Sequence, residues 1–499
     1  MELEFEKKVC QYLDQVIRDS RLEEQTQEIR LGEGMPDVGR VIGAWGQVIL
    51  RGKEWRGDSI SLSGGVMAWV LYAPEDGSEP RCLDTWLPFK MKWDLPEGVR
   101  EGEIRASCLL RSVDARSISP RKIMARAVVS LQIAVLCPGE AEVFVPGAVP
   151  EGVELLKRSY PIRLLREAGE KAFQIEEVLP LKGSDPVPGK IFCCGLQPRI
   201  TDRKVLGDKV VFRGSGNLHL LGRTEDGQLH AWDFELPFSQ IAQLRETYGP
   251  DARAELTMGV TSLEPELDSE GKLRVKCGMV GQYLVDDREM VELVEDAYST
   301  GREVDVHTQE LKLPAMLDSR TENIFGEQKL PVDASRVVDS VFLPEQPRIR
   351  QSDTGVELEI PGLFQVLYYG EGGELAAASV RMEMDRMLET APDVRVDGEV
   401  ELPDRPGITM GDGGLELSVE LPVKLTSSSR QGIPQVTGMT LGEEKEPDPA
   451  RPSLILCRAG DQSLWQIAKS TGSSVEAIRR INDLQEEPES GRMLLIPVS

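Results

Sequence analysis

The sequence predicts a mainly β protein, in which three tandem antiparallel, sandwich-like repeats precede a small α+β module of βααβ order. Three observations lead to this prediction. Sequence markers recur with a period near 150 residues, alternating apolar residues run up to glycine-bearing turns, and residues 454–499 carry a separate pattern. The chain of 499 residues is long enough for three or four domains, and its 40% hydrophobic content is typical of globular proteins.

The clearest repeat marker is a short segment centred on glycine or aspartate. Gly39, Gly189 and Asp339 occupy its centre and are 150 residues apart. The three copies of the marker are Pro36–Ile42, Val187–Phe192 and Val338–Phe342. Several markers that keep one order and nearly one spacing indicate duplication of an ancestral domain.

Each repeat contains stretches in which every second residue is apolar. Val66, Ala68, Val70 and Tyr72 alternate before the Asp76-Gly77 turn, as expected for a β-hairpin. The corresponding residues are Leu218 and Leu220 in the second copy, and Leu363, Gln365, Leu367 and Tyr369 in the third. Later strands are predicted at Ile123–Val129, Leu273–Cys277 and Leu415–Leu421.

Helices are predicted to be few. Residues 1–29 carry Val9, Leu13, Val16 and Ile17 at helical spacing and are expected to form an amphipathic helix that lies on the first domain. A partner-binding helix is the alternative for this segment. A second helix is expected over Leu164–Phe173, between repeats one and two.

These patterns divide the chain into six segments. Residues 442–453 are charged and rich in proline, so they are predicted to be an extended linker. The predicted segments are 1–29 (helix), 30–150 (repeat one), 151–315 (connecting helix and repeat two), 316–441 (repeat three), 442–453 (linker) and 454–499 (C-terminal module).

The C-terminal module has signals for two strands and two helices. A strand at Leu454–Cys457 is followed by a turn and a helix that Gly472 is expected to end. Ser473 and Ser474 are candidate caps of a second helix, which Asn482 ends. Met493–Pro497 is the closing strand.

The module resembles the LysM family at Gly460-Asp461, Leu464-Trp465-Gln-Ile467-Ala468, Asn482 and Gly491-Arg-Met-Leu494-Leu-Ile496-Pro497. The resemblance implies a shallow groove that binds polymers of N-acetylglucosamine, such as peptidoglycan. Its two walls would be formed by Gly460, Asp461, Ser463 and Leu464 on one side and by Asn482, Asp483 and Leu484 on the other.

The module also departs from the family pattern. Two residues separate Gly460-Asp461 from Leu464-Trp465 where the family usually has one. The second wall carries Glu486, Glu487 and Glu489 where an aromatic residue would favour sugar stacking. Both departures weaken the sugar interpretation. Trp465 is interpreted as a core residue, and Asp461 is a candidate for a structural cap as much as for a sugar contact.

Residues 30–440 resemble the SPOCS domain of spore-forming Firmicutes. The resemblance is carried by Pro36–Ile42, Gly64–Tyr72, Leu87-Pro-Phe89 and Ser119–Ile123. Together with the LysM-like module, the chain is similar to the SipL-type spore morphogenesis family. This implies a scaffold of the endospore coat in the mother-cell cytoplasm. It would be recruited to the forespore surface and would bind a morphogenetic ATPase and other coat proteins through both domain types. A peptidoglycan-binding cell-wall protein is the alternative.

Composition and motifs favour binding over catalysis. The net charge of −26 repels nucleic acid and anionic lipid, and no run of about 18 apolar residues or basic leader is present. No HExxH, GxSxG or GxxxxGK[ST] occurs, so no enzyme, metal or cofactor is expected. His219 and His230 are interpreted as surface residues on paired strands, and the eight cysteines as reduced, mostly buried thiols. A wall hydrolase with a carboxylate pair is the third hypothesis.

Overall fold

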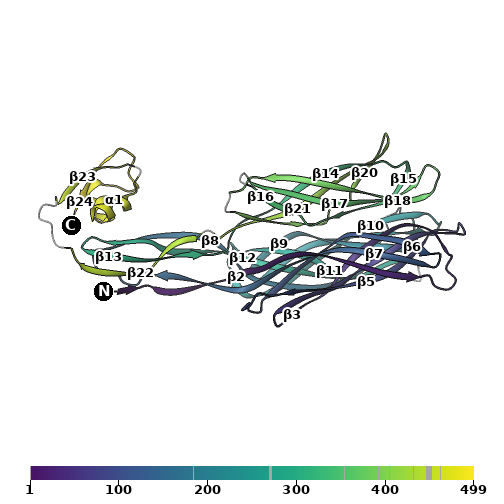
Figure 1. Ribbon diagram of the computed structural model, residues 1–499, viewed down its shortest axis with the longest axis horizontal. Helices are drawn as coiled ribbons and strands as arrows, with labels where there is room; N and C mark the ends of the chain where they lie inside the picture. The colour runs from purple at the N-terminus through teal and green to yellow at the C-terminus, as the bar shows by residue number, and fades with distance from the viewer. Residues whose placement is uncertain are drawn as a thin grey trace.

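The computed structural model confirms the predicted fold class: the protein is mainly β, and the two helices of the described residues lie in the C-terminal module (Figure 1). A β-sheet body narrows into a stalk of long strands, and the module lies at the end of the stalk near the N-terminus. The structure describes residues 2–181, 183, 185–268, 272–352, 355–391, 394–403, 405–430, 432–445, 452–460 and 462–498.

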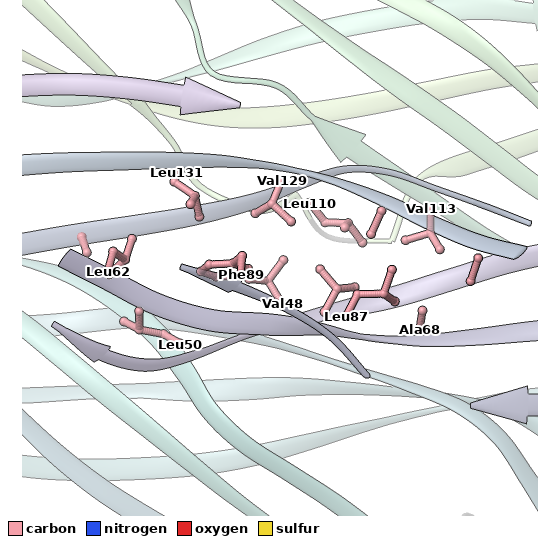
Figure 2. Close-up of a cluster of buried hydrophobic side chains, with 14 of the residues drawn as sticks. Val48, Leu50, Leu62, Ala68, Leu87, Phe89, Leu110, Val113, Val129 and Leu131 are labelled. Atoms are coloured by element: carbon pink, nitrogen blue, oxygen red, sulfur yellow. The ribbon is translucent and has the colours of Figure 1, made fainter. Parts of the chain in front are cut away.

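Repeat one forms two antiparallel sheets that pack face to face. One sheet has the order β3-β4-β5 and the other the order β2-β7-β6. Figure 2 shows apolar side chains such as Val48, Leu87 and Val129 between the strands. The strands are β2 (Glu6–Arg30), β3 (Val38–Arg56), β4 (Ser59–Pro74), β5 (Arg81–Asp94), β6 (Glu103–Ser119) and β7 (Lys122–Val145).

Repeat two has the same plan with fewer, longer strands. Strand β9 pairs with β10, and the second sheet has the order β11-β12-β8. Its core includes Phe212, Leu218 and Trp232. The strands are β8 (Val153–Leu179), β9 (Pro188–Thr224), β10 (Leu229–Tyr248), β11 (Arg253–Leu267) and β12 (Leu273–Ser299).

Repeat three is built from two four-stranded sheets around a third apolar core. In one sheet β17 pairs with β15, β16 and β18, and in the other β21 pairs with β14, β19 and β20. The strands are β14 (Ala315–Leu330), β15 (Ala334–Pro344), β16 (Arg348–Ser352), β17 (Gly355–Gly370), β18 (Leu375–Leu388), β19 (Arg395–Val400), β20 (Gly407–Gly411) and β21 (Gly414–Ser429).

The alternating residues predicted for repeats one and two face the cores. In repeat three the predicted phase is wrong, because Phe364 and Val366 are buried in its core whereas Leu363 and Gln365 are half-buried on the other face of β17. The spacing explains this error. Leu71, Leu221 and Leu367 hold corresponding positions in the three repeats and meet in one apolar cluster. The third copy of this strand therefore lies 146 residues after the second, whereas the prediction assumed 150.

The stalk consists of residues 2–15, 136–145, 153–164, 287–299, 302–312 and 432–444. Three antiparallel strand pairs form it: the outer parts of β2 and β7, the outer parts of β8 and β12, and β13 (Arg302–Lys312) with β22 (Gly432–Glu444). The short first strand, β1 (Glu2–Glu4), pairs with β22 on its other edge. Two apolar clusters, which include Leu164, Leu293, Val436 and Met439, fill its interior.

Both helices predicted outside the C-terminal module are wrong. Residues 6–30 form β2 and residues 153–179 form β8, and each strand is the partner of the last strand of its repeat. Each carries one extra residue, at Val16 and at Arg166, where the register with its partner shifts. Such a β-bulge interrupts the two-residue alternation, so the apolar residues on either side imitate helical spacing.

Ion pairs and hydrogen bonds join the three repeats near the centre of the body. Arg105 on β6 contacts both Thr257 on β11 and Glu399 on β19, and Thr257 donates a hydrogen bond of 2.9 Å to Glu399. Nearby, Lys424 on β21 pairs with Glu255 on β11, and both side chains are buried. These contacts fix the repeats relative to one another.

The cysteines are unpaired in the structure, and the described helices are short. All eight cysteines are free, and burial raises the pKa of the Cys82, Cys108 and Cys194 thiols to about 12. In the residues that the structure describes, neither eight-residue helix has the length or apolar character needed to span a bilayer.

Candidate functional site

The C-terminal module folds in the predicted βααβ order. Its elements are β23 (Leu454–Arg458), α1 (Leu464–Thr471), α2 (Val475–Asn482) and β24 (Met493–Pro497), and the two strands pair in antiparallel fashion. Leu464, Ile467, Ile478 and Leu494 form the centre of its apolar core.

Polar caps set the ends of both helices. Ser463 caps α1 in a capping box, because its hydroxyl accepts a hydrogen bond from the Gln466 amide and the Gln466 side chain accepts one from the Ser463 amide. Ser474 caps α2 in a similar way. Gly472 ends α1 with a φ of 64°, a left-handed conformation that suits glycine.

The first predicted groove wall is the loop between β23 and α1. Gly460 is exposed, and no atom lies within 4 Å of the position that a Cβ would take there. Asp461 lies outside the described residues. Ser463 is exposed at the helix cap, and the Leu464 side chain is completely buried. A ligand at this wall would therefore meet Gly460 and Ser463 rather than the Leu464 side chain.

The second predicted wall follows α2. The Asn482 side chain donates hydrogen bonds to the carbonyls of Ile478 and Leu495 and accepts one from the Leu495 amide, so it fixes β24 against α2. Asp483 is exposed with a left-handed φ of 52°, and the Leu484 side chain is buried. Of this wall, Asp483 has the side chain most open to a ligand.

Hydrogen bonds hold the two walls close together. The Glu487 carboxylate accepts a hydrogen bond of 2.9 Å from the Leu464 amide at the start of α1, where a negative charge is favoured by the helix dipole. The Ala459 amide also donates a hydrogen bond to the Arg492 carbonyl, and the Ala459 carbonyl accepts one from the Gly491 amide. The acidic residue that departs from the family pattern therefore connects the two sides of the groove.

A different face of the module docks on the tip of the stalk. The Trp465 indole donates a hydrogen bond of 2.9 Å to Asp296 on β12, and Lys469 pairs with both oxygens of the same carboxylate at 2.7 and 2.8 Å. The Tyr298 hydroxyl donates to the Ser473 carbonyl at 2.8 Å, and its ring packs edge-on against Trp465 with centroids 4.8 Å apart. Trp465 thus joins a core that includes a stalk residue.

The docking contacts change the acidity of Asp296. Its partial burial raises the pKa, but the hydrogen bonds from Lys469 and Trp465 outweigh burial, and the pKa is lowered. Neither Asp296 nor Tyr298 was expected to have a role, because a strand sequence carries no signal for a partner about 170 residues away. With the module docked, Gly460, Ser463 and Asp483 remain exposed.

The LysM domain family matches residues 458–497, which covers α1, α2, β24 and the end of β23. The C-terminal module is a LysM domain. No curated protein and no solved structure matches the chain. The resemblance of residues 30–440 to SPOCS domains and the ligand-binding role of the groove residues remain predictions.

His219 is not the surface residue that the sequence suggested. Its ring is only 29% exposed, with Nδ1 2.7 Å from Asp233 and Nε2 2.9 Å from Asp339 of repeat three. Arg405 pairs with Asp233 at 2.7 Å and lies 3.5 Å from Asp339. We call these four residues the junction quartet. The sequence did not reveal it, because Asp339 and Arg405 are more than 100 residues away from the hairpin that carries His219 and Asp233, and no functional motif surrounds any of the four residues.

The junction quartet predicts a pH effect on stability. Burial lowers the pKa of His219, but Asp339 and Asp233 outweigh it and raise the pKa from 6.5 to about 10. The charged ring therefore stabilises the fold fully below pH 6.5, and this contribution is lost as the pH rises to about 10. The urea midpoint of the wild type should exceed that of His219→Gln at pH 6. The two midpoints should converge as the pH rises to roughly 10.5. The exposed His307→Gln is the control, and a constant difference between wild type and His219→Gln would contradict the prediction.

Proposed function

We propose that the protein is a non-enzymatic binding protein, in which the LysM domain binds a polymer that contains N-acetylglucosamine, such as peptidoglycan. The family match at residues 458–497 carries this proposal, because the family groove is built from the two loops described above. The docking arrangement supports it. The stalk contacts Trp465, Lys469 and Ser473, which leaves the groove loops open to solvent.

A single substitution in the groove tests the glycan proposal. Gly460→Glu places a bulky, negatively charged side chain in open space, so it should obstruct the groove without distorting the fold. Full-length wild type should sediment with insoluble peptidoglycan, and the variant should lose at least about tenfold in affinity, equivalent to about 1.4 kcal/mol. Gly249→Glu, at an equally open and exposed site in the body, is the matched control.

Each outcome of the sedimentation experiment has one interpretation. Equal sedimentation of Gly460→Glu and wild type would place glycan binding outside this groove. Absence of wild-type sedimentation would reject the glycan ligand. Release of reducing sugar or peptide from the peptidoglycan by the wild type would reject a non-enzymatic role.

A second candidate function is a scaffold of the endospore coat. Glu486, Glu487 and Glu489 support it, because these exposed carboxylates beside the groove suit a basic protein surface better than a sugar face. The resemblance to SipL-type proteins names the partner class, a morphogenetic ATPase on the forespore surface together with other coat proteins. In this function the protein works in the mother-cell cytoplasm.

The two candidates differ in what removal of the LysM domain does. A pull-down from sporulating cells should recover the ATPase with the full chain and lose it when residues 454–499 are deleted. If the shortened chain keeps the coat partner but no longer binds glycan, the scaffold contact does not involve this domain. Fluorescent fusion protein should form a ring around the forespore, and a signal at the outer wall would reject the scaffold.

A further inference from the structure

A cavity of about 480 Å³ lies where the three repeats meet in the body. Each repeat contributes two corresponding segments to its wall. Repeat one contributes residues 46–48, 50 and 108–110, repeat two contributes 195–198 and 258–260, and repeat three contributes 340–343, 402, 403, 405 and 406. Repeat two adds residues 217–219 and 233–235. The cavity is therefore a product of the assembled body and absent from any single repeat.

The charged groups at the cavity neutralise one another. The junction quartet, His219, Asp233, Asp339 and Arg405, holds two positive and two negative charges in mutual contact. The Gln47 amide is also engaged, since its oxygen accepts from the Leu196 amide at 2.8 Å and its nitrogen donates to the Val48 carbonyl. These groups shape the wall without presenting a net charge to a ligand.

The rest of the wall is mainly apolar. Leu110, Leu218, Phe234, Met258 and Phe342 contribute aliphatic, aromatic and thioether surface from all three repeats. The exposed Glu235 adds one negative charge, which disfavours an anionic ligand. A concave, mostly apolar site of a few hundred Å³ with a few fixed polar groups is the usual form of a small-molecule site.

We propose that this cavity binds a neutral, largely apolar small molecule at the junction of the three repeats. The ligand packs against the apolar side chains and makes contacts with all three repeats at once. Its binding therefore stabilises the assembled body relative to separated repeats. The site is distinct from the LysM groove, so the proposal does not depend on the glycan function.

An uncharged fluorescent probe tests the cavity in the full-length chain. N-phenyl-1-naphthylamine should bind with one saturable site and raise the thermal midpoint of the body. Gly195→Leu should weaken the probe at least tenfold, because Gly195 lines the cavity and the nearest atom to a new Cβ is Gln47 Oε1 at 3.8 Å. Leu402→Trp, at a 37% exposed position of the wall, obstructs the site from the other side. Gly249→Leu is the control and should bind as wild type does.

Three outcomes would overturn the proposal. The first is a wild type that shows no saturable binding. The second is equal binding by wild type, Gly195→Leu and Leu402→Trp, with all three folded by circular dichroism. The third is tighter binding of the anionic probe 8-anilinonaphthalene-1-sulfonate than of the neutral one, which would contradict the ligand class. Loss of probe binding in both wall variants with an unchanged control supports the site.

Discussion

Lys424→Met is expected to lower the free energy of unfolding of the body by about 3–5 kcal/mol, because it leaves the Glu255 carboxylate buried without its cation. Burial raises the pKa of Glu255, yet the pair with Lys424 outweighs it and lowers the pKa. The carboxylate therefore stabilises the fold above its unfolded value of 4.5, and this contribution is lost as the pH falls. Urea denaturation followed by circular dichroism measures the change.

Two comparisons separate the lost ion pair from a general effect. Lys209→Met removes an exposed lysine from β9 and should change the midpoint little. The double variant Lys424→Met and Glu255→Gln removes both charges and should recover part of the loss. A double variant that is less stable than Lys424→Met alone would show that the cost does not come from the unpaired carboxylate.

Asp296→Ala is expected to release the LysM domain from the stalk. The substitution removes the acceptor for both Trp465 and Lys469, and hydrogen bonds with a charged group contribute about 1.5–3 kcal/mol each. Because Asp296 and Lys469 are partly exposed, the two contributions are smaller than this and not additive, and a total loss of about 1.4–2.8 kcal/mol should lower the equilibrium constant for docking by roughly 10- to 100-fold. Hydrogen exchange in α1 should become faster by a similar factor, while exchange in the core of repeat one stays unchanged.

Asp305→Ala on β13 is the control, because Asp305 is an exposed carboxylate of the stalk that does not contact the LysM domain in any described hydrogen bond or ion pair. Small-angle scattering should show a wider range of domain positions for Asp296→Ala and no change for the control. Unchanged exchange and scattering in Asp296→Ala would mean that the ring contact of Tyr298 with Trp465 and its hydrogen bond to Ser473 hold the domain without Asp296.

The sequence predicted the cores well where the two-residue alternation is uninterrupted. Ile123, Ala125 and Ala127 are buried as expected, as are Leu415 and Leu417. The prediction failed where an extra residue shifts the phase of this alternation. Bulges occur at Val16, Arg166 and Leu317, which are corresponding positions in the first strand of each repeat, and two of them led to a false helix.

For the candidate site, the sequence predicted the local contacts but not the distant ones. Caps such as Ser463, Ser474 and Gly472 depend on residues a few positions away, so the sequence located them. Docking through Asp296 joins residues more than 100 positions apart, and the junction quartet joins the β9–β10 hairpin, which carries His219 and Asp233, to residues of repeat three that are also more than 100 positions away. Such pairs arise from strand register and repeat assembly, which local sequence patterns do not reveal.

The pairing of β1 with β22 constrains the order in which the chain acquires its structure. Glu2 lies opposite Thr440, so β1 waits for a strand that follows it by 438 residues before its hydrogen bonds form. Repeat one is able to bury its core while the ribosome is still translating repeat two, but the stalk edge that β1 occupies stays unpaired until β22 has emerged. Closure of the stalk tip is therefore a late event of folding, and the LysM domain that docks there is synthesised after β22.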